Sequence, residues 1–495
     1  MKYITISEAA TKFNLSERSV RNYCSQNRIP GAILQGKTWL IPFDAQKPER
    51  SNGKENDVDE EALSLGYELV SFINNSPVSF FAIDNVKRLL VDNGYQELLE
   101  NKPYDVKPGD KVFFLRNGSS LVALNVGRNV TPDNISYHVI ASHSDSPCLK
   151  IKPESDSKSD IYNRLNVEVY GGLIASTWLD RPLGIAGRVI INNEEGLESR
   201  LINLEDNLVM IPNLCIHFNR DINSGYNYDR SVDLQAFVGQ ELEGQPLRDL
   251  LAKNLRVEKK DIVNFDLYLY NHEQGYIWGS KKEYVSSSRL DDLECVFTSS
   301  KAFANSSNDN AINVLYIADN EEVGSMSRQG ADSDFLEGIL RNISAKLGGN
   351  YQNSIANSFL ISADNAHAVH PNKPSISDPN NRPYMNKGIA IKYNAAQSYT
   401  SDAISGAIFQ RICENVDVPY QFFTNRSDIR GGSTLGDILL SHLSFLSVDV
   451  GLPQLAMHSS FETTGTIDIK YAFKAFKEFY SSNIEINGNR YKISK

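Results

Sequence analysis

The sequence is poor in cysteine, and its five cysteines form no CxxC pair. They are widely spaced and odd in number, which argues against a disulfide framework and favours a reducing compartment. No apolar run reaches the ~18 residues that a membrane-spanning helix needs. The N-terminal stretch MKYITISEAATKF also lacks the apolar core of a signal peptide. We therefore expect a cytoplasmic protein with no membrane partner.

The chain as a whole also lacks an excess of positive charge. It has 50 basic and 61 acidic residues, so its net charge of −11 does not indicate nucleic-acid binding by the whole molecule. Residues 1–50 differ from the rest, because they hold eight basic and four acidic residues. The polar stretch KPERSNGKENDVDEE follows and shows no apolar period. The sequence therefore predicts a small basic domain at 1–50, a linker at 51–60 and a larger acidic body.

The basic domain has the pattern of two short helices followed by a β-ribbon. Ser7 is the expected N-cap of a helix in TISEAATKFN, and Ser16 that of a second helix in SERSVRNYCSQ. The stretch IPGAILQGKTWLIP predicts a ribbon that turns at Gln35-Gly36. These elements predict a winged helix-turn-helix.

Two arginines, Arg18 and Arg21, lie on the expected exposed side of the second helix. Arginines on the second helix are typical of a helix-turn-helix that reads DNA. The stretch resembles the excisionase or MerR-like helix-turn-helix family, including its wing, GKTWLIP. DNA is therefore one expected partner, and the alternative is a docking module whose arginines only keep a surface solvated.

In the acidic body, strands and helices alternate on both sides of a β-rich segment. Helical periods in DEEALSLGYELVSFINNS and SFFAIDNVKRLLVDNGYQELLE precede a hairpin with an Asn-Gly turn and a buried strand in SYHVIASHSDS. Residues 152–284 hold short β-rich stretches and one helix, in PLRDLLAKNL. The alternation returns in AINVLYIADN, SFLISADNAH and GIAIKYN. This order predicts an α/β domain, built from 61–151 and 285–495, into which the β-rich segment is inserted.

Residues that can bind metals follow several of the expected strands. They lie in the segments ASHSDSP, SRLDDL, ADNEEVG, SADNAHAVHP and AMHSSFE, as His143, Asp145, Asp291, Asp292, Glu321, Glu322, Asp364, His367, His370 and His458. In open α/β sheets, ligands gather beyond the carboxyl ends of the strands. A mixture of imidazoles and carboxylates suits zinc, with manganese or cobalt as alternatives. The segments together predict a metal site.

A pair of metal ions would explain why acids crowd the end of one strand in ADNEEVG. Divalent cations reverse the repulsion between neighbouring carboxylates, and one glutamate can bind metal while the other acts as a base. Each segment alone has a plainer explanation. An HxD sequence is often a capped turn, adjacent acids are often a solvated surface, and a lone His458 is more often a core histidine. The prediction therefore depends on their joint occurrence at strand ends.

Taken in order, these segments resemble the aspartyl aminopeptidase family of co-catalytic zinc metallopeptidases. The resemblance covers about 61–480 and extends to YGGLIASTWLDRPLGIAGRV, IPNLCIHFNR, NKGIAIKYN and GGSTLGDI. It implies a catalytic domain with a central mixed sheet flanked by helices and a β-rich dimerisation domain at 152–284. It also implies removal of N-terminal residues, acidic ones among them, from short peptides by water activated at two divalent metal ions, with Zn²⁺ expected first.

The resemblance further implies a role for each matching residue. The metal ligands would be His143, Asp291, Glu322, Asp364 and His458, with Asp291 bridging the two ions. Glu321 would be the general base, and Asp145 would orient the imidazole of His143. Asp292 departs from the pattern, because the family usually has Asn at this position.

Three more residues match positions that contact substrate in the family. His367 and Lys392 would face the substrate within their own chain. His217 matches a histidine that reaches into the active site of the neighbouring subunit. The resemblance therefore implies a homo-oligomer with a dimer as the smallest active unit, and a dodecamer as the common assembly of the family.

Two functions follow from the whole chain. The first is an aminopeptidase with an appended helix-turn-helix domain. The second is a DNA-binding transcriptional regulator whose peptidase-like body senses peptide or metal. The sequence favours the first, because the residue expected to act as the base, Glu321, is retained, whereas a sensor does not need it.

Overall fold

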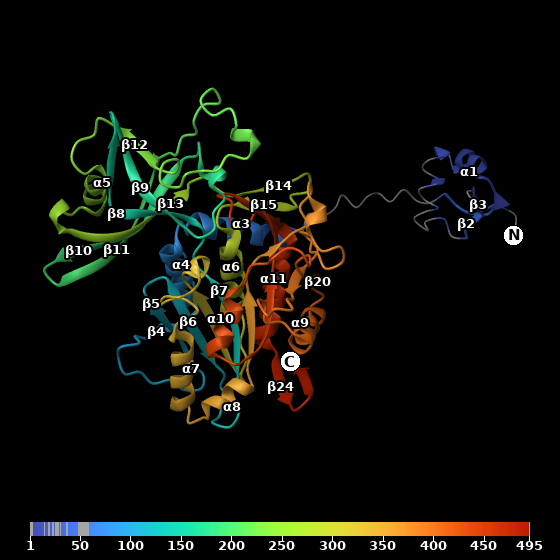
Figure 1. Ribbon diagram of the computed structural model, residues 1–495. Coiled ribbons are helices and arrows are strands. Elements are labelled where there is room, and N and C mark those ends of the chain that lie inside the picture. The colour runs from blue at the N-terminus through green and yellow to red at the C-terminus, as the bar shows by residue number, and fades with distance from the viewer. Residues whose placement is uncertain are drawn as a thin grey trace. The chain divides into compact units, whose positions relative to one another are not determined.

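The computed structural model describes residues 3–13, 15–17, 20–21, 24, 29, 31–35, 38–47 and 59–494. The chain divides into two compact units, Met1–Val58 and Asp59–Lys495, which we call the head and the body (Figure 1). In the part of the chain that the structure describes, no helix has the length and apolar character needed to cross a bilayer.

The head contains a short helix packed on a small sheet. Its described elements are β1 (Tyr3–Ile4), α1 (Ile6–Phe13), β2 (Ile33–Gln35) and β3 (Thr38–Pro42). The sheet has the order β1-β3-β2, and the antiparallel pairing of β2 with β3 confirms the predicted ribbon. Buried Ile6, Phe13 and Ile41 are part of its core.

Some details of the head differ from the prediction. Ser7 is not the N-cap of α1. The Glu8 amide donates to Thr5 Oγ1 and the Thr5 amide donates to Glu8 Oε2, which makes a capping box with Thr5, two residues before Ser7, as the cap. The second helix lies mostly outside the described residues, as do Arg18 and the turn residue Gly36. Arg21 is described, and it is exposed and pairs with Glu17 at 3.5 Å.

The body is built on a nine-stranded mixed sheet. In spatial order its strands are β20 (Tyr420–Phe423), β19 (Ile389–Lys392), β21 (Leu446–Gly451), β17 (Phe359–Ala363), β7 (Tyr137–His143), β16 (Ile312–Ala318), β6 (Ser120–Val126), β5 (Lys111–Arg116) and β4 (Gln96–Glu97). The four central strands β21, β17, β7 and β16 run parallel. Antiparallel strands flank them, which confirms the predicted central mixed sheet.

Helices cover both faces of this sheet (Figure 1). One face packs against α3 (Glu60–Asn74), α4 (Ser79–Asp92), α6 (Leu290–Ala304), α9 (Ala403–Asn415) and α11 (Thr466–Ser481), and the other against α7 (Phe335–Lys346), α8 (Tyr351–Ala356) and α10 (Leu435–His442). Side chains of β7 alternate between the two cores, with Ile140 in the first and Val139 in the second. Helix α4 is shorter than predicted, because Gly94 at φ 82° stops it and Gln96–Glu97 form a strand instead.

A second sheet, of six strands, is formed by residues that lie in the sequence between β7 and β16 of the first sheet. Its strands, in order, are β11 (Gly196–Val209), β10 (Leu183–Asn193), β13 (Ile262–Asn271), β8 (Cys148–Ser159), β9 (Tyr162–Tyr170) and β12 (Ala236–Gln240). Helix α5 (Pro246–Leu255) packs on it, as PLRDLLAKNL predicts, and the sheet has its own hydrophobic core. We call this region the inserted sheet.

Smaller sheets complete the body. A five-stranded sheet has the order β14 (Tyr276–Trp278), β15 (Tyr284–Ser287), β23 (Glu462–Gly465), β22 (Pro453–Leu455) and β18 (Ala366–His367). A terminal hairpin joins β24 (Asn483–Asn487) to β25 (Arg490–Ser494). The loop between β22 and β23 carries His458, and the chain that leaves β15 leads to Asp291 at the start of α6.

Candidate metal centre

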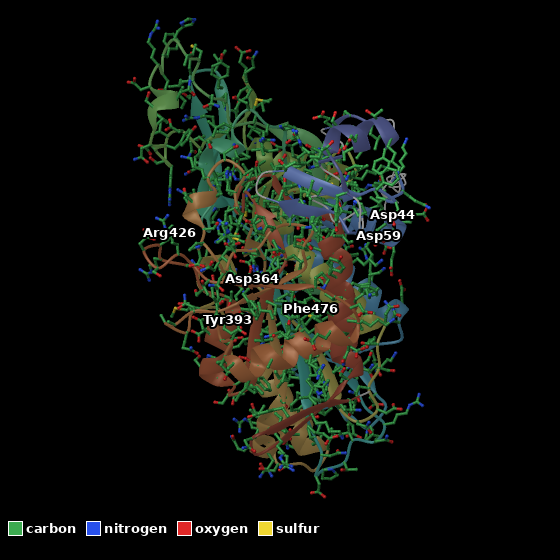
Figure 2. The ribbon with its side chains drawn as sticks, turned by 90° about the vertical axis from the view of Figure 1, so that its right-hand side faces the viewer. Asp44, Asp59, Asp364, Tyr393, Arg426 and Phe476 are labelled. Carbon is green, nitrogen blue, oxygen red and sulfur yellow. The ribbon has the colours of Figure 1, made fainter. Side chains whose placement is uncertain are left out.

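Three neighbouring parallel strands deliver polar residues to the same edge of the nine-stranded sheet. His143 is the last residue of β7 and lies opposite Ala318, the last residue of β16. The chain then enters a 3-10 turn, η4 (Glu321–Val323), which contains Glu321 and Glu322. Asp364 directly follows β17, and Figure 2 marks it near the middle of the body in that view. Parallel strands therefore bring together residues that are far apart in the sequence.

Asp291 lies between two histidines from different segments. It stands at the start of α6, where its φ and ψ of −81° and 111° are not yet helical. Asp291 Oδ1 is 3.5 Å from His143 Nε2, and Asp291 Oδ2 is 3.5 Å from His458 Nε2. His458 Nε2 is also 3.3 Å from Glu322 Oε2. The two oxygens of one carboxylate thus face two separate sets of neighbours.

These side chains form overlapping groups that are suited to binding metal. The groups, in each of which the ligand atoms lie within 4.8 Å of one another, are His143 with Asp291 and Asp364, His143 with Glu321 and Glu322, and Asp291 with Glu322 and His458. Asp291 Oδ1 and Glu322 Oε1 are buried and accept no hydrogen bond from the described residues. Buried oxygens without donors, next to imidazole nitrogens, fit zinc.

The site concentrates negative charge where water has little access. Burial raises the pKa of Glu321 to about 8, and the carboxylates of Asp364 and Asp145 add to this rise. Burial likewise raises the pKa of Asp364 to about 6, although the nearby ammonium of Lys392 acts in the opposite direction. Lys392 Nζ lies 3.8 Å from Asp364 Oδ2. Divalent cations between the carboxylates would remove the repulsion that these shifts reflect.

Asp145 lies directly behind His143 and the η4 turn. Its carboxylate accepts the Glu321 amide at 3.1 Å on one oxygen and the Glu322 amide at 3.2 Å on the other. His143 Nδ1 lies 3.1 Å from the Asp145 carbonyl, to which it can donate. That bond leaves His143 Nε2 free to face Asp291 as a ligand atom. Asp145 therefore positions one histidine and both glutamates.

A cavity of about 140 Å³ opens onto these residues. Lys392 and His367 line it, together with Tyr399 and Phe423. Lys392 is buried, and its ammonium lies 5.5 Å from the centre of the Tyr399 ring. The cavity therefore combines one cation with aromatic walls beside the acidic cluster.

Two histidines that drew attention in the sequence lie elsewhere. His370 does not line the cavity, and its Nδ1 accepts the amide of Asn372. His217 lies on an exposed segment after β11 and is absent from the cavity lining of its own chain. The structure therefore does not bring His217 together with the acidic cluster within one chain.

Glu462 was not among the residues predicted from the sequence, although it ends the quoted segment AMHSSFE. It is buried, and its two oxygens accept the amide of Asp291 at 3.1 Å and that of His458 at 2.7 Å. One carboxylate therefore fixes the backbone of two residues that face each other in the site. Its place four residues after His458, in a strand of another sheet, gave no periodic signal.

Asp292, which departs from the family pattern, is also buried at the site. Its Oδ2 accepts the amide of His143 at 3.1 Å. Burial raises the pKa of Asp292 well above its usual value, and the carboxylates of Asp364 and Asp291 add to the rise. Its surroundings therefore disfavour the negative charge that Asp, in place of the family's Asn, would add at this position. The hydrogen bond from the His143 amide requires only a side-chain oxygen.

Known proteins resemble this chain over almost its whole body. A family model described as "Aminopeptidase I zinc metalloprotease (M18)" matches residues 72–480, and a model described as "Helix-turn-helix domain" matches residues 3–45. A probable M18 family aminopeptidase 2 from Clostridium novyi is 46% identical over 429 residues, which cover 85% of this chain and 99% of that protein. A protein of the same name from Ectopseudomonas mendocina is 37% identical over 420 residues, covering 84% of this chain and 97% of that protein.

Solved structures share the same architecture. The cryo-EM structure of the Ape4 and Nbr1 complex contains a chain with 34% identity and a TM-score of 0.82, covering 85% of this chain and 86% of that chain. The structure of the S. cerevisiae mApe1 dodecamer has 26% identity and a TM-score of 0.74, covering 84% of this chain and 96% of that chain. The likeness in both cases spans the body.

Proposed function

Because the chain belongs to the M18 family of zinc aminopeptidases, we propose that it removes N-terminal residues from short peptides at two zinc ions that share Asp291. The observation that carries this proposal is the position of Asp291 between His143 and His458, with each of its oxygens 3.5 Å from one histidine nitrogen. His143 and Asp364 would complete one metal site. His458 and Glu322 would complete the other.

The chain's own residues account for the proton movements that hydrolysis requires. When bound, zinc polarises the scissile carbonyl and makes a water molecule more acidic. Glu321 lies in the same cluster but is not one of the proposed metal ligands. It would take the proton from water and return it to the leaving amine. Burial raises the pKa of this carboxyl to about 8 in the metal-free protein, and cations bound beside it would lower that pKa, so that the carboxylate is available to accept a proton.

The cavity beside the cluster suggests an acidic N-terminal residue in the substrate. Lys392 is the cation of this cavity, and aromatic rings flank it. An aspartate or glutamate side chain entering the cavity would place its carboxylate near the Lys392 ammonium. A peptide-library digest by the zinc-loaded enzyme tests this preference, and Lys392→Met should reduce the discrimination between acidic and aliphatic N-terminal residues.

The Glu321→Gln variant tests the proposed mechanism. It keeps the size of the side chain but cannot accept the proton, so kcat should fall by about 10²–10⁴-fold while zinc remains bound. Kinetics on a short peptide and metal analysis of the same sample measure both quantities. Glu195→Gln, the same change at an exposed position of the inserted sheet, is the control and should leave both unchanged. Retention of more than a few per cent of wild-type kcat by Glu321→Gln would contradict the role of the base.

We propose an oligomer, with the dimer as the smallest active unit and the dodecamer as the full assembly. A dodecamer is the form named for mApe1. The segment that carries His217 also exposes apolar side chains on both sides of it, Leu214 at 59%, Ile216 at 49% and Phe218 at 83%. A neighbouring subunit would cover these apolar side chains, and His217 would then lie near the cavity of that neighbouring subunit. Mass measurement in solution tests the assembly, and His217→Ala should reduce activity without changing the mass.

A second function is proposed for the head, namely DNA binding. It is supported by the match of residues 3–45 to a helix-turn-helix family model and by the exposed Arg21. A gel-shift experiment on full-length protein and on a variant lacking residues 1–55 tests it at two salt concentrations, since phosphate contacts weaken with salt. Equal binding by both proteins would overturn the role of the head. Peptidase activity should be the same in the full-length protein and in the variant lacking residues 1–55. A regulator whose body only senses peptide would show no peptidase activity in either protein.

A further inference from the structure

The segment Tyr170-Gly171-Gly172, at the end of strand β9 of the inserted sheet, lies against the candidate metal centre of its own chain. Tyr170 is the last residue of β9, and its hydroxyl donates to Asp145 Oδ2 at 2.6 Å. Gly171 adopts φ 74°, and a Cβ at this position would lie 3.1 Å from Glu322 Cβ. Any larger residue at this position would therefore press on Glu322.

The same segment also touches the opposite side of the centre. His458 Nδ1 lies 3.2 Å from the carbonyl oxygen of Gly172, to which it can donate. That bond fixes the tautomer that leaves His458 Nε2 facing Asp291 and Glu322. Three consecutive residues of the inserted sheet thus contact Asp145, Glu322 and His458.

The direction of the Tyr170 hydrogen bond is fixed by its other partner. Asn320 Nδ2 donates to the Tyr170 hydroxyl at 2.8 Å. The Asn320 amide cannot be reversed without loss, because its Oδ1 accepts both Ser327 Oγ and Gln329 Nε2 at 2.8 Å. The phenol oxygen therefore accepts from Asn320, and its only hydrogen is left for Asp145. Burial, together with the carboxylates of Asp145 and Asp319, raises the pKa of Tyr170, so this hydrogen stays in place across the working pH range.

We propose that Tyr170 is a positioning residue of the metal centre, which acts by holding the Asp145 carboxylate in the orientation that fixes His143 and the Glu321–Glu322 turn. The proposal rests on the proposed function and adds a role for the inserted sheet within its own subunit. Asp145 accepts two backbone amides and the phenol, so loss of the phenol removes one of three donors. The carboxylate can then rotate, and the turn that carries both glutamates loses its fixed anchor.

The test is Tyr170→Phe, which removes the hydroxyl and keeps the ring. Tyr268→Phe is the matched control, because its ring packs edge-on against Tyr170 at 5.9 Å and its hydroxyl forms no hydrogen bond with the described residues. In metal-free protein, hydrogen exchange measured by mass spectrometry on the 319–324 segment should quicken about tenfold in Tyr170→Phe. In zinc-loaded protein, kcat should fall about 10–100-fold with KM changed little. The visible spectrum of the Co²⁺-substituted enzyme should change as well.

The outcomes separate this proposal from the proposed function. If Tyr170→Phe matches wild type and Tyr268→Phe in exchange, spectrum and kcat, the positioning role is overturned. If both variants lose activity alike, the sheet contributes through packing alone, and the role is again overturned. If wild-type protein hydrolyses no peptide, the proposed function fails, whereas the exchange of the 319–324 segment still decides whether Tyr170 anchors the turn.

Discussion

Strand β7 carries one histidine in the interior of the sheet, His138, and one at the carboxyl end of the strand, His143. The surroundings of these two imidazoles differ in charge and in hydrogen bonding. His138 and His143 are both 1% exposed. His138 packs against the ring of Phe479 at 5.4 Å, and neither of its ring nitrogens has a hydrogen-bond partner among the described residues. His143 has Asp145 on one nitrogen and Asp291 on the other.

The difference in surroundings sets the charge of each imidazole. Burial alone lowers the pKa of His138 to about 4. Burial acts in the same direction on His143, but Asp145 and Asp291 outweigh it and raise the pKa of His143 well above its usual value. Burial alone therefore does not mark a metal site. His143 differs from His138 because it ends its strand, where the carboxylates of Asp145 and Asp291 lie beside its ring.

The largest expected effect comes from removing the histidine at the edge. His143→Ala should lower zinc binding and kcat by at least ~100-fold, more than the loss of a residue that only supports a ligand. Metal analysis after dialysis and peptide kinetics measure both. His138→Phe, a change on the same strand at equal burial, is the control and should keep kcat within about twofold. Equal losses in the two variants would show that any disturbance of β7 damages the centre.

A smaller effect is expected on stability, and it belongs to the interior histidine. In the unfolded chain His138 takes up a proton near pH 6.5, whereas in the folded chain it does so only near pH 4. The free energy of unfolding of the wild type therefore falls as pH is lowered between these values. His138→Phe removes this loss. The free energy of unfolding of the variant relative to wild type should rise by about 2 kcal/mol between pH 8 and pH 5. Denaturant titrations at both pH values measure it, and the difference between the pH values cancels any change in packing. A constant difference would mean that His138 finds a hydrogen-bond partner in solution.

The comparison also shows which parts of the site could be predicted from sequence. The sequence indicates His143 as a candidate ligand because an acid, Asp145, follows it two residues later in a polar loop. Strands such as Ile312–Ala318 and helices such as Pro246–Leu255 follow their apolar periods, and these periods are local. Local patterns also located the strand ends at which the acids gather. The identity of the ligand set came from a resemblance, since spacing alone left each segment open to a plainer explanation.

Contacts made across sheets could not be predicted in this way. Tyr170 and Glu462 lie in strands of two other sheets, and their link to the centre exists only once the three sheets are packed together. Such contacts depend on three-dimensional neighbours, which one sequence does not reveal. The cap of α1 is a different case, because the sequence holds the signal for Thr5 rather than Ser7, namely Glu8 three residues after Thr5, as in a capping box.

The smallest expected effect concerns Asp292, which supports His143 from the backbone side. Its Oδ2 accepts the His143 amide, and its Oδ1 accepts no hydrogen bond from the described residues. Asn keeps an acceptor for that amide, so Asp292→Asn should change kcat by less than about threefold. Asp292→Ala removes the acceptor and should cost about 10-fold, because a buried amide is left without a partner. Parallel kinetics on the two variants distinguish the causes. A loss in Asp292→Asn as large as in Asp292→Ala would show that the site needs the negative charge of this residue as well as its oxygen. Asp292 would then join Asp145 and Asp291 as a carboxylate that distinguishes the surroundings of His143 from those of His138.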